Sequence, residues 1–197
     1  MLKKIVYTTL FSSAILFAES GIGVNINEQD LEIEGILDSR NLQAMQTSST
    51  IYQADVNFLY DNEQAKLISG GIGATNKVEG VEGLEATLGL KYVWAEVGLN
   101  QNSSFNAVPF LAKVRYTFPP LMYNIPPVSI EGKFLFAPKV LSFGNSQLYK
   151  EFRLNAEMEV IESGSIYAGY RNIHTKYDGI SNSLFNNSFY GGIKITY

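Results

Sequence analysis

The sequence contains no cysteine, only one histidine and few charged residues. The lack of cysteine excludes disulfide bonds, thiolate chemistry and zinc sites built on cysteine. A single histidine leaves too few ligands for a transition-metal site, so neither a metal site nor a cofactor is predicted. Charged residues make up 17% of the chain, and the net charge is −4. Nucleic acid is therefore excluded as a partner, because phosphate binding needs clustered lysine and arginine.

The sequence also lacks an apolar run long enough for a membrane-spanning helix, which needs about 20 residues. The apolar stretch of residues 5–17 is only 13 residues long and follows Lys3 and Lys4. A short positive start, an apolar stretch and then Ala18 as a small residue for cleavage are typical of a signal peptide. We therefore predict a signal peptide over residues 1–18 and a single exported domain over residues 19–197. No cysteine follows the cleavage site, which excludes a lipid-anchored lipoprotein.

What the chain does have is aromatic residues (13%), 17 glycines and side chains that alternate between apolar and polar. A strand places successive side chains on opposite faces. At the end of the chain, the apolar face carries Phe189, Gly191, Ile193, Ile195 and Tyr197. A last strand of this kind, ending in an aromatic residue, is typical of an outer-membrane β-barrel. The predicted assembly signal, which the barrel assembly machinery would recognise, comprises Phe189, Ile193, Ile195 and Tyr197.

The same alternation recurs in ten segments of the chain. They are residues 21–27, 31–37, 50–60, 66–75, 84–92, 108–118, 128–136, 149–161, 165–171 and 189–197. Single-chain bacterial barrels have an even number of strands. This rule favours ten strands, and eight remain open if the first two segments lie outside the wall. The sequence thus predicts an all-β fold, namely a closed antiparallel transmembrane up-and-down β-barrel.

The regions between these segments carry further predictions. The alternation changes phase over residues 94–99, which predicts a bulge or the start of a loop. Four prolines between residues 119 and 127 predict a turn, because proline is not tolerated in a central strand. Residues 138–148 and residues 176–188 are predicted to be loops.

Alternation alone does not decide which face of the strands points inward. A soluble, lipocalin-like barrel has its apolar face inside, whereas a membrane barrel has it outside. Here the apolar face ends repeatedly in aromatic residues, as it does at the two interfaces of a bilayer. These residues are Tyr52, Tyr60, Tyr92, Tyr116, Phe118, Phe136, Tyr170 and Tyr197. The sequence therefore favours a barrel in the outer membrane of a Gram-negative bacterium, with the lipid of that membrane as a partner.

The charged residues of the polar face are predicted to form a network inside the barrel. They are the bases Lys91, Lys113, Arg115, Lys133, Arg153, Arg171 and Lys194 and the acids Glu32, Glu34, Asp55, Glu85, Glu131, Glu151, Glu157 and Glu159. A lysine or arginine that faces lipid at mid-depth costs about 2–4 kcal/mol. All the bases together would then cost more than the stability of a typical domain, about 5–15 kcal/mol. A ten-stranded barrel is narrow, so we expect a polar, occluded interior rather than a porin channel.

Five stretches of the chain carry a resemblance to known proteins: APKVLSF (residues 137–143), YKEFR (149–153), GYRNI (169–173), YDG (177–179) and YGGIKITY (190–197). With these stretches the chain resembles a known family, the YfaZ-like outer-membrane proteins. The resemblance is strongest from about Leu84 onward, and weaker but collinear before it. These stretches are strand and loop signatures, and none is a catalytic motif. The resemblance implies an outer-membrane barrel of unassigned function and carries over no site residues.

Three function classes are open at this point. The favoured one is a structural or surface-interaction barrel whose outer loops, residues 138–148 and 176–188, meet the exterior. The second is a narrow pore for small solutes. The third is a hydrolase or acyltransferase on the rim, with His174 as general base near Asp178, Ser181 and Ser183. A solvent-exposed rim histidine explains His174 more simply, so we predict no enzyme and no catalytic residue.

Overall fold

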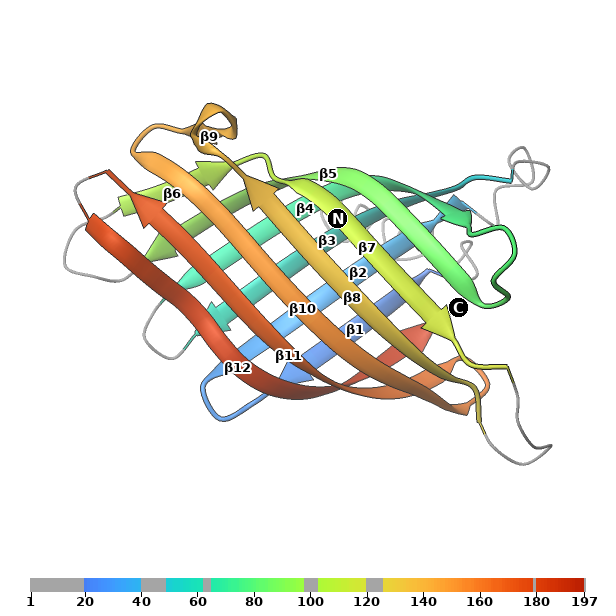
Figure 1. Ribbon diagram of the computed structural model, residues 1–197. Helices are drawn as coiled ribbons and strands as arrows, with labels where there is room; N and C mark the ends of the chain where they lie inside the picture. Colours follow the sequence, from blue (N-terminus) through green and yellow to red (C-terminus); the bar gives the residue numbers. More distant parts are fainter. Residues whose placement is uncertain are drawn as a thin grey trace, which may run out of the picture.

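The computed structural model describes residues 20–39, 49–61, 65–97, 103–119, 126–178 and 180–196 (Figure 1). The predicted signal peptide, residues 1–18, and Tyr197 lie outside the described residues. In the described part of the chain, ten antiparallel strands close into a barrel. The predicted all-β fold and its ten strands are thus confirmed. Among the described residues, no helix is long and apolar enough to cross a membrane.

Each strand pairs with its neighbours in the sequence, and the last strand closes the wall by pairing with the first. The elements are β1 (Gly21–Ile26), β2 (Asp30–Asp38), β3 (Ile51–Asp61), β4 (Lys66–Lys77), β5 (Leu84–Val97), β6 (Ser103–Ala107), β7 (Phe110–Thr117), β8 (Val128–Ala137), the 3₁₀ turn η4 (Lys139–Leu141), β9 (Ser142–Phe143), β10 (Ser146–Ile161), β11 (Gly164–Tyr177) and β12 (Ile180–Thr196). Both β6 and β7 pair with β5, so they form one interrupted strand of the wall. The short β9 lies between β8 and β10 in the sequence but pairs with β6.

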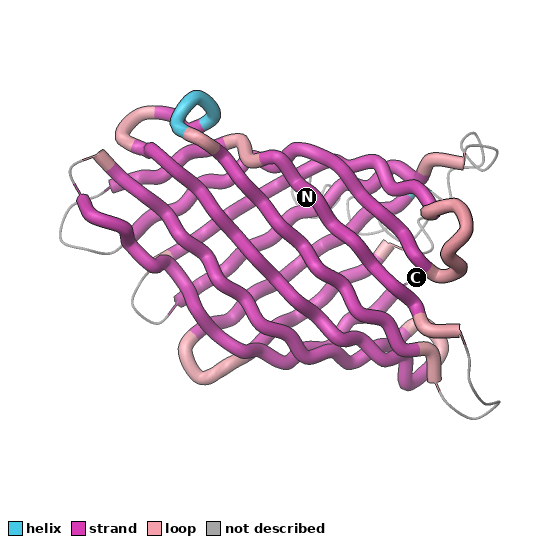
Figure 2. The backbone as a smooth tube through the Cα atoms, viewed as in Figure 1, coloured by secondary structure: helices cyan, strands magenta, loops and turns pink. Residues whose placement is uncertain are grey.

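The wall has two rims, which Figure 2 shows as the two ends of the tilted strands. The terminal rim is the one where β1 begins at Gly21 and β12 ends at Thr196, which are register partners. The connections β2–β3, β4–β5, β7–β8 and β10–β11 belong to this rim. The far rim carries the other connections, including the segment with η4 and β9.

Two predicted interruptions of the wall are wrong. The phase change predicted over residues 94–99 does not occur in the described residues, because β5 continues to Val97 without a register shift against β4. The loop predicted over residues 176–188 is mostly strand, since β11 runs to Tyr177 and β12 begins at Ile180. In β5 the period of two is kept while the polarity of the faces reverses. In β12 a bulge interrupts the period, because Ile173 pairs with Asn186 and His174 with Leu184, and the consecutive residues Phe185 and Asn186 are both buried. Apolar side chains such as Val93 and Ile173 point inward there and are buried.

The sixth strand differs from its predicted range of residues 108–118. It is broken at Val108 and Pro109, and β7 begins only at Phe110. Proline has no N–H to donate to a neighbouring strand, so it interrupts the ladder at this point. The carbonyl of Pro109 still accepts a hydrogen bond from the N–H of Lys91 (3.0 Å), which keeps the break close to β5.

Through the middle of the barrel, apolar side chains point outward and charged ones point inward. Phe134, Leu154 and Ile195 are 44%, 46% and 57% exposed, whereas Arg153 is 3% exposed. The opposite arrangement would define a soluble barrel with an apolar core. The outward face of the wall is therefore apolar over most of its height.

Near the far rim, the interior is apolar rather than polar. A buried cluster fills it, comprising Leu59, Ala65, Leu67, Val93, Ala95, Phe105, Ala107, Leu111, Leu135, Ala137, Tyr149, Ile173, Tyr177 and Phe185. Phe105 stands at its centre, with ring centroids 5.8 Å from Tyr149 and 5.5 Å from Tyr177. We call this set the apolar cluster. The expectation of a polar interior throughout is thus corrected for this part of the barrel.

Candidate functional site

Charged side chains occupy the middle of the barrel, between the apolar cluster and the terminal rim. Seven acids and seven bases take part in ion pairs there. They are Asp30, Glu32, Glu34, Asp55, Glu131, Glu151 and Glu157, with Lys91, Lys113, Arg115, Lys133, Arg153, Arg171 and Lys194. We call this set the ion-pair network. Its members come from β2, β3, β5, β7, β8, β10, β11 and β12, so it ties opposite parts of the wall together.

Arg171 on β11 is fully buried and bridges two acids of β2. Its Nη2 lies 2.6 Å from Oδ1 of Asp30, and its Nη1 lies 2.5 Å from Oε2 of Glu32. Its Nε donates a hydrogen bond to the side-chain oxygen of Asn186 on β12 (3.0 Å). The guanidinium carbon lies 5.2 Å from the centroid of the Tyr190 ring. Each of the three nitrogens of this guanidinium therefore has a protein partner.

Arg153 on β10 continues the network on the other side of Glu32. Its Nη1 lies 2.8 Å from Oε1 of Glu32, and its Nε donates to Glu151. Glu151 also accepts a hydrogen bond from the hydroxyl of Tyr149 in the apolar cluster (2.5 Å). Removing one partner from a buried ion pair leaves an uncompensated charge and costs about 3–5 kcal/mol. This part of the network thus fixes β2 against β10 and β11.

On the opposite wall, Lys91 of β5 pairs with Asp55 of β3. The Nζ of Lys91 also donates to the side-chain oxygen of Asn57 (2.8 Å), whose amide nitrogen donates to Glu32 (3.0 Å). The lysine stem passes over Gly71 of β4. A Cβ at position 71 would lie only 2.4 Å from Cγ of Lys91, so glycine is required there by the close approach of this side chain.

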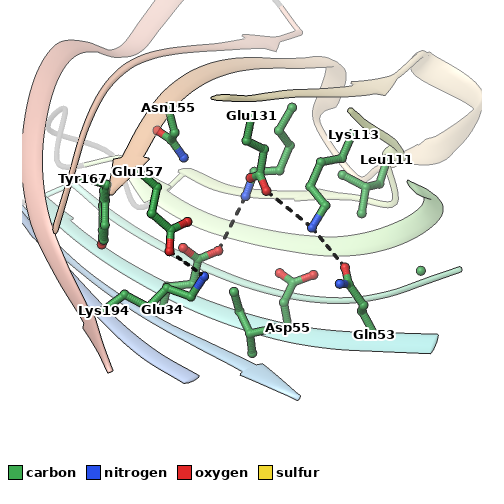
Figure 3. Close-up of a pocket in the computed structure, with 14 residues that line it drawn as sticks. Glu34, Gln53, Asp55, Leu111, Lys113, Glu131, Asn155, Glu157, Tyr167 and Lys194 are labelled. Carbon is green, nitrogen blue, oxygen red and sulfur yellow. Dashed lines mark hydrogen bonds and ion pairs between the residues drawn. The ribbon is translucent and has the colours of Figure 1, made fainter. Parts of the chain in front are cut away.

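Toward the terminal rim the pairs become longer and less buried. Figure 3 shows two of them, Glu157 with Lys194 and Glu131 with Lys113. Glu157 lies 3.1 Å from Arg115 and 3.3 Å from Lys194. Glu131 lies 3.7 Å from Lys113 and 3.9 Å from Arg115. A cavity of about 60 Å³ lies among these groups, with Lys133 and Glu34 on its lining. It has room for no more than a few water molecules.

A larger cavity, of about 360 Å³, opens at the terminal rim. Its lining includes Thr117, Gly164 and Thr196 from the strand ends, and Lys113, Arg115, Glu157 and Lys194 from the ion-pair network. Glu85 and Glu159 also line it, and neither forms an ion pair with another described residue. The interior is therefore hollow at the terminal rim and filled farther in.

The structure places 13 of the charged residues predicted for the interior within the ion-pair network; the exceptions are Glu85 and Glu159. It also adds Asp30, which was not predicted because it lies between the two predicted strands of residues 21–27 and 31–37. The sequence did contain a signal that Asp30 points inward, because Asp30 is two residues from Glu32 and a strand places both side chains on one face. Of the predicted assembly signal, Phe189, Ile193 and Ile195 are exposed on the outer face of β12.

Of the residues predicted for the rim site, only His174 and Asp178 have described side chains, and no hydrogen bond or ion pair joins the two. His174 lies on the outward face of β11, and its register partner on β10 is Lys150. Asp178 lies 3.9 Å from Lys139 and accepts a hydrogen bond from Gln147. Ser181 and Ser183 belong to β12, with side chains outside the described part. Within the described residues, no group of three or more histidine, aspartate and glutamate side chains is arranged to hold a metal ion.

A family model described as YfaZ precursor matches residues 11–197, which is nearly the whole chain. In the searches of curated proteins and of solved structures, nothing matched the chain.

Proposed function

Since the chain belongs to the YfaZ precursor family, we propose that it is a non-conducting outer-membrane β-barrel with a structural or surface-interaction role. One observation carries the proposal: charged side chains pair inside the barrel while apolar side chains cover its outer face. In water this outer face would be a continuous apolar patch of a kind that soluble monomers rarely expose. Acyl chains of a bilayer are the environment in which such a face is stable.

The height of the apolar face supports a membrane span. On β10 the outward side chains from Phe152 to Val160 carry no charge, and on β8 the same holds from Val128 to Phe136. Each stretch covers nine residues, and a tilted transmembrane strand needs about 9–11. With both chain ends on the periplasmic side, as in other barrels of this kind, the far rim faces the exterior.

The filled interior supports a barrel that does not conduct. Between the cavity at the terminal rim and the far rim stand the ion-pair network and then the apolar cluster. A permeating ion would have to separate buried pairs and then cross an apolar layer, and both steps are costly. The loops of the far rim, rather than a channel, are then the parts that meet other molecules.

Recording from the refolded protein in a planar bilayer tests this role. We expect the protein to insert without unit conductance steps. Steady, reproducible steps would contradict the proposal and favour the second candidate, a narrow pore for small solutes. The cavity of about 360 Å³ is the observation that favours this candidate, because it would be the pore entrance.

The proposed role includes no catalysis. In an assay of lipid and ester turnover, the protein and its His174→Ala variant should both be inactive. Turnover that is present in the natural protein and lost in the variant would contradict this part of the proposal, and would assign His174 to a hydrolase or acyltransferase.

A further inference from the structure

Three lysines gather on the outer surface of the wall next to the far rim. Lys150 on β10 and His174 on β11 are register partners, and Lys176 lies one outward position beyond His174. Lys139, in η4, approaches the end of β11 through its 3.9 Å contact with Asp178. Lys139, Lys150 and Lys176 are all exposed. We call Lys139, Lys150 and Lys176 the basic patch.

The surrounding protein pairs only Lys139 of the basic patch with an acid in the described part of the chain. In this half of β8, β10 and β11, the other outward side chains among the described residues are Phe134, Phe136, Leu148, Phe152, Tyr170, Asn172 and His174, and none is acidic. Neither Lys150 nor Lys176 forms an ion pair with a described residue. Asp178 contacts the patch through Lys139, and its carboxylate also accepts a hydrogen bond from Gln147. The patch therefore presents net positive charge to whatever lies beside the wall.

The patch lies directly above the apolar face. On β10, Phe152 ends the apolar stretch and Lys150 is the next outward residue, about 7 Å farther along the strand. Aromatic side chains mark the same level on the neighbouring strands, with Phe136 on β8 and Tyr170 on β11. Aromatic residues sit at the level of lipid headgroups in membrane proteins. The lysines are thus at the height of the headgroup phosphates.

We propose that the basic patch binds the phosphate groups of lipids in the leaflet next to the far rim. The ligand is an amphipathic lipid with a phosphomonoester headgroup. Its phosphate pairs with Lys150 and Lys176, and its acyl chains lie on Phe152 and Leu154 below them. A lipid fits better than a free phosphate ion because the positive charge is continuous with the apolar face. This inference rests on the proposed membrane location.

Titration of the folded barrel in detergent micelles, followed by native mass spectrometry, tests the proposal. The probes are phosphatidic acid, phosphatidylcholine with the same acyl chains, and inorganic phosphate. The variant is Lys150→Gln/Lys176→Gln. The matched control is Lys66→Gln/Lys77→Gln, which removes the same charge from exposed positions on β4, across the barrel. Each lysine near an anionic surface strengthens binding about fivefold, so the variant should bind phosphatidic acid roughly 30-fold more weakly.

The control variant should bind phosphatidic acid as the natural protein does, and phosphatidylcholine and inorganic phosphate should bind weakly to all three proteins. Equal loss in both variants, or no loss in the first, would overturn the proposal. Inorganic phosphate that binds as tightly as the lipid would overturn it in favour of a soluble anion.

Flotation with phosphatidylcholine vesicles distinguishes a failure of the lipid site from a failure of the proposed membrane location. If the natural protein fails to float, both the membrane location and the lipid site are contradicted. If it floats but does not prefer phosphatidic acid, only the lipid site falls.

Discussion

At the scale of single residues, Arg171 holds the interior together. It contacts acids from the start of β2 and an amide from β12, although it is itself on β11. Its guanidinium can serve several acceptors at once because its five N–H donors lie in a fixed plane. Lysine in the same place would offer a point charge and could not bridge Asp30 and Glu32 in the same way.

Arg171→Met should lower the free energy of unfolding by about 3–5 kcal/mol, because Glu32 and Asp30 would lose a buried cation while remaining out of water. Urea titration of the barrel in vesicles, followed by tryptophan fluorescence, measures the change. Lys139→Met is the control, since Lys139 is 69% exposed and its pair with Asp178 should contribute at most about 1 kcal/mol. A loss below about 1 kcal/mol in the Arg171 variant would show that this network does not stabilise the barrel.

At the scale of elements, β6 and the strands beside it owe their position near the far rim to the apolar cluster. Phe105 of β6 is fully buried against Tyr149 and Tyr177. Phe105→Ala should therefore cost about 3–5 kcal/mol of unfolding free energy, the usual range for a buried phenylalanine. Phe143→Ala in β9 is the matched control, because that ring is 51% exposed and its removal should change stability by no more than about 0.5 kcal/mol. Equal effects in the two variants would mean that the cluster is not a packed layer.

The strand β10, with 16 residues, is longer than a membrane span requires. Its outward position 156 lies in the middle of the apolar stretch, and position 148 lies beyond it, near the far rim. For folding into vesicles, Ala156→Arg should cost about 2–4 kcal/mol and Leu148→Arg about 0–1 kcal/mol. Equal costs at the two positions would contradict the depth that we assign to this strand.

The strands could be predicted from the sequence because alternation with a period of two survives in almost every one of them. In β5 the error arose because polarity, rather than period, was used to follow the strand, and in β12 a bulge at Phe185 and Asn186 also breaks the period. Val93 and Ala95 point inward in β5, as do Ile173 and Tyr177 in β11, so apolar residues on that face resembled a change of phase. The pairing of individual charges could not be predicted. Glu32 meets Arg153 and Arg171 across 121 and 139 residues of sequence, and only the register of the closed wall determines those contacts.

At the scale of the whole molecule, the barrel has the opposite polarity to a soluble protein over most of its height, with paired ionised groups inside and apolar groups outside. This arrangement ends near the far rim, where the apolar cluster fills the interior and lysines lie on the outer face. Near the far rim, therefore, the interior changes from charged to apolar, and at about the same height the outer face changes from apolar to basic. This change gives the two rims different properties, with a polar cavity of about 360 Å³ at one and packed apolar side chains at the other.

Because the chain contains no cysteine, single cysteines can be introduced into β10 one at a time and spin-labelled in a cysteine-free background. Oxygen accessibility of the label in vesicles is the most direct test of which face meets lipid. Labels at Leu154, Ala156 and Val160 should be highly accessible to oxygen dissolved in the bilayer, and labels at Asn155 and Glu159 should not. The reverse order, or no alternation between the two sets, would contradict the claim that the apolar face of this barrel lies against lipid.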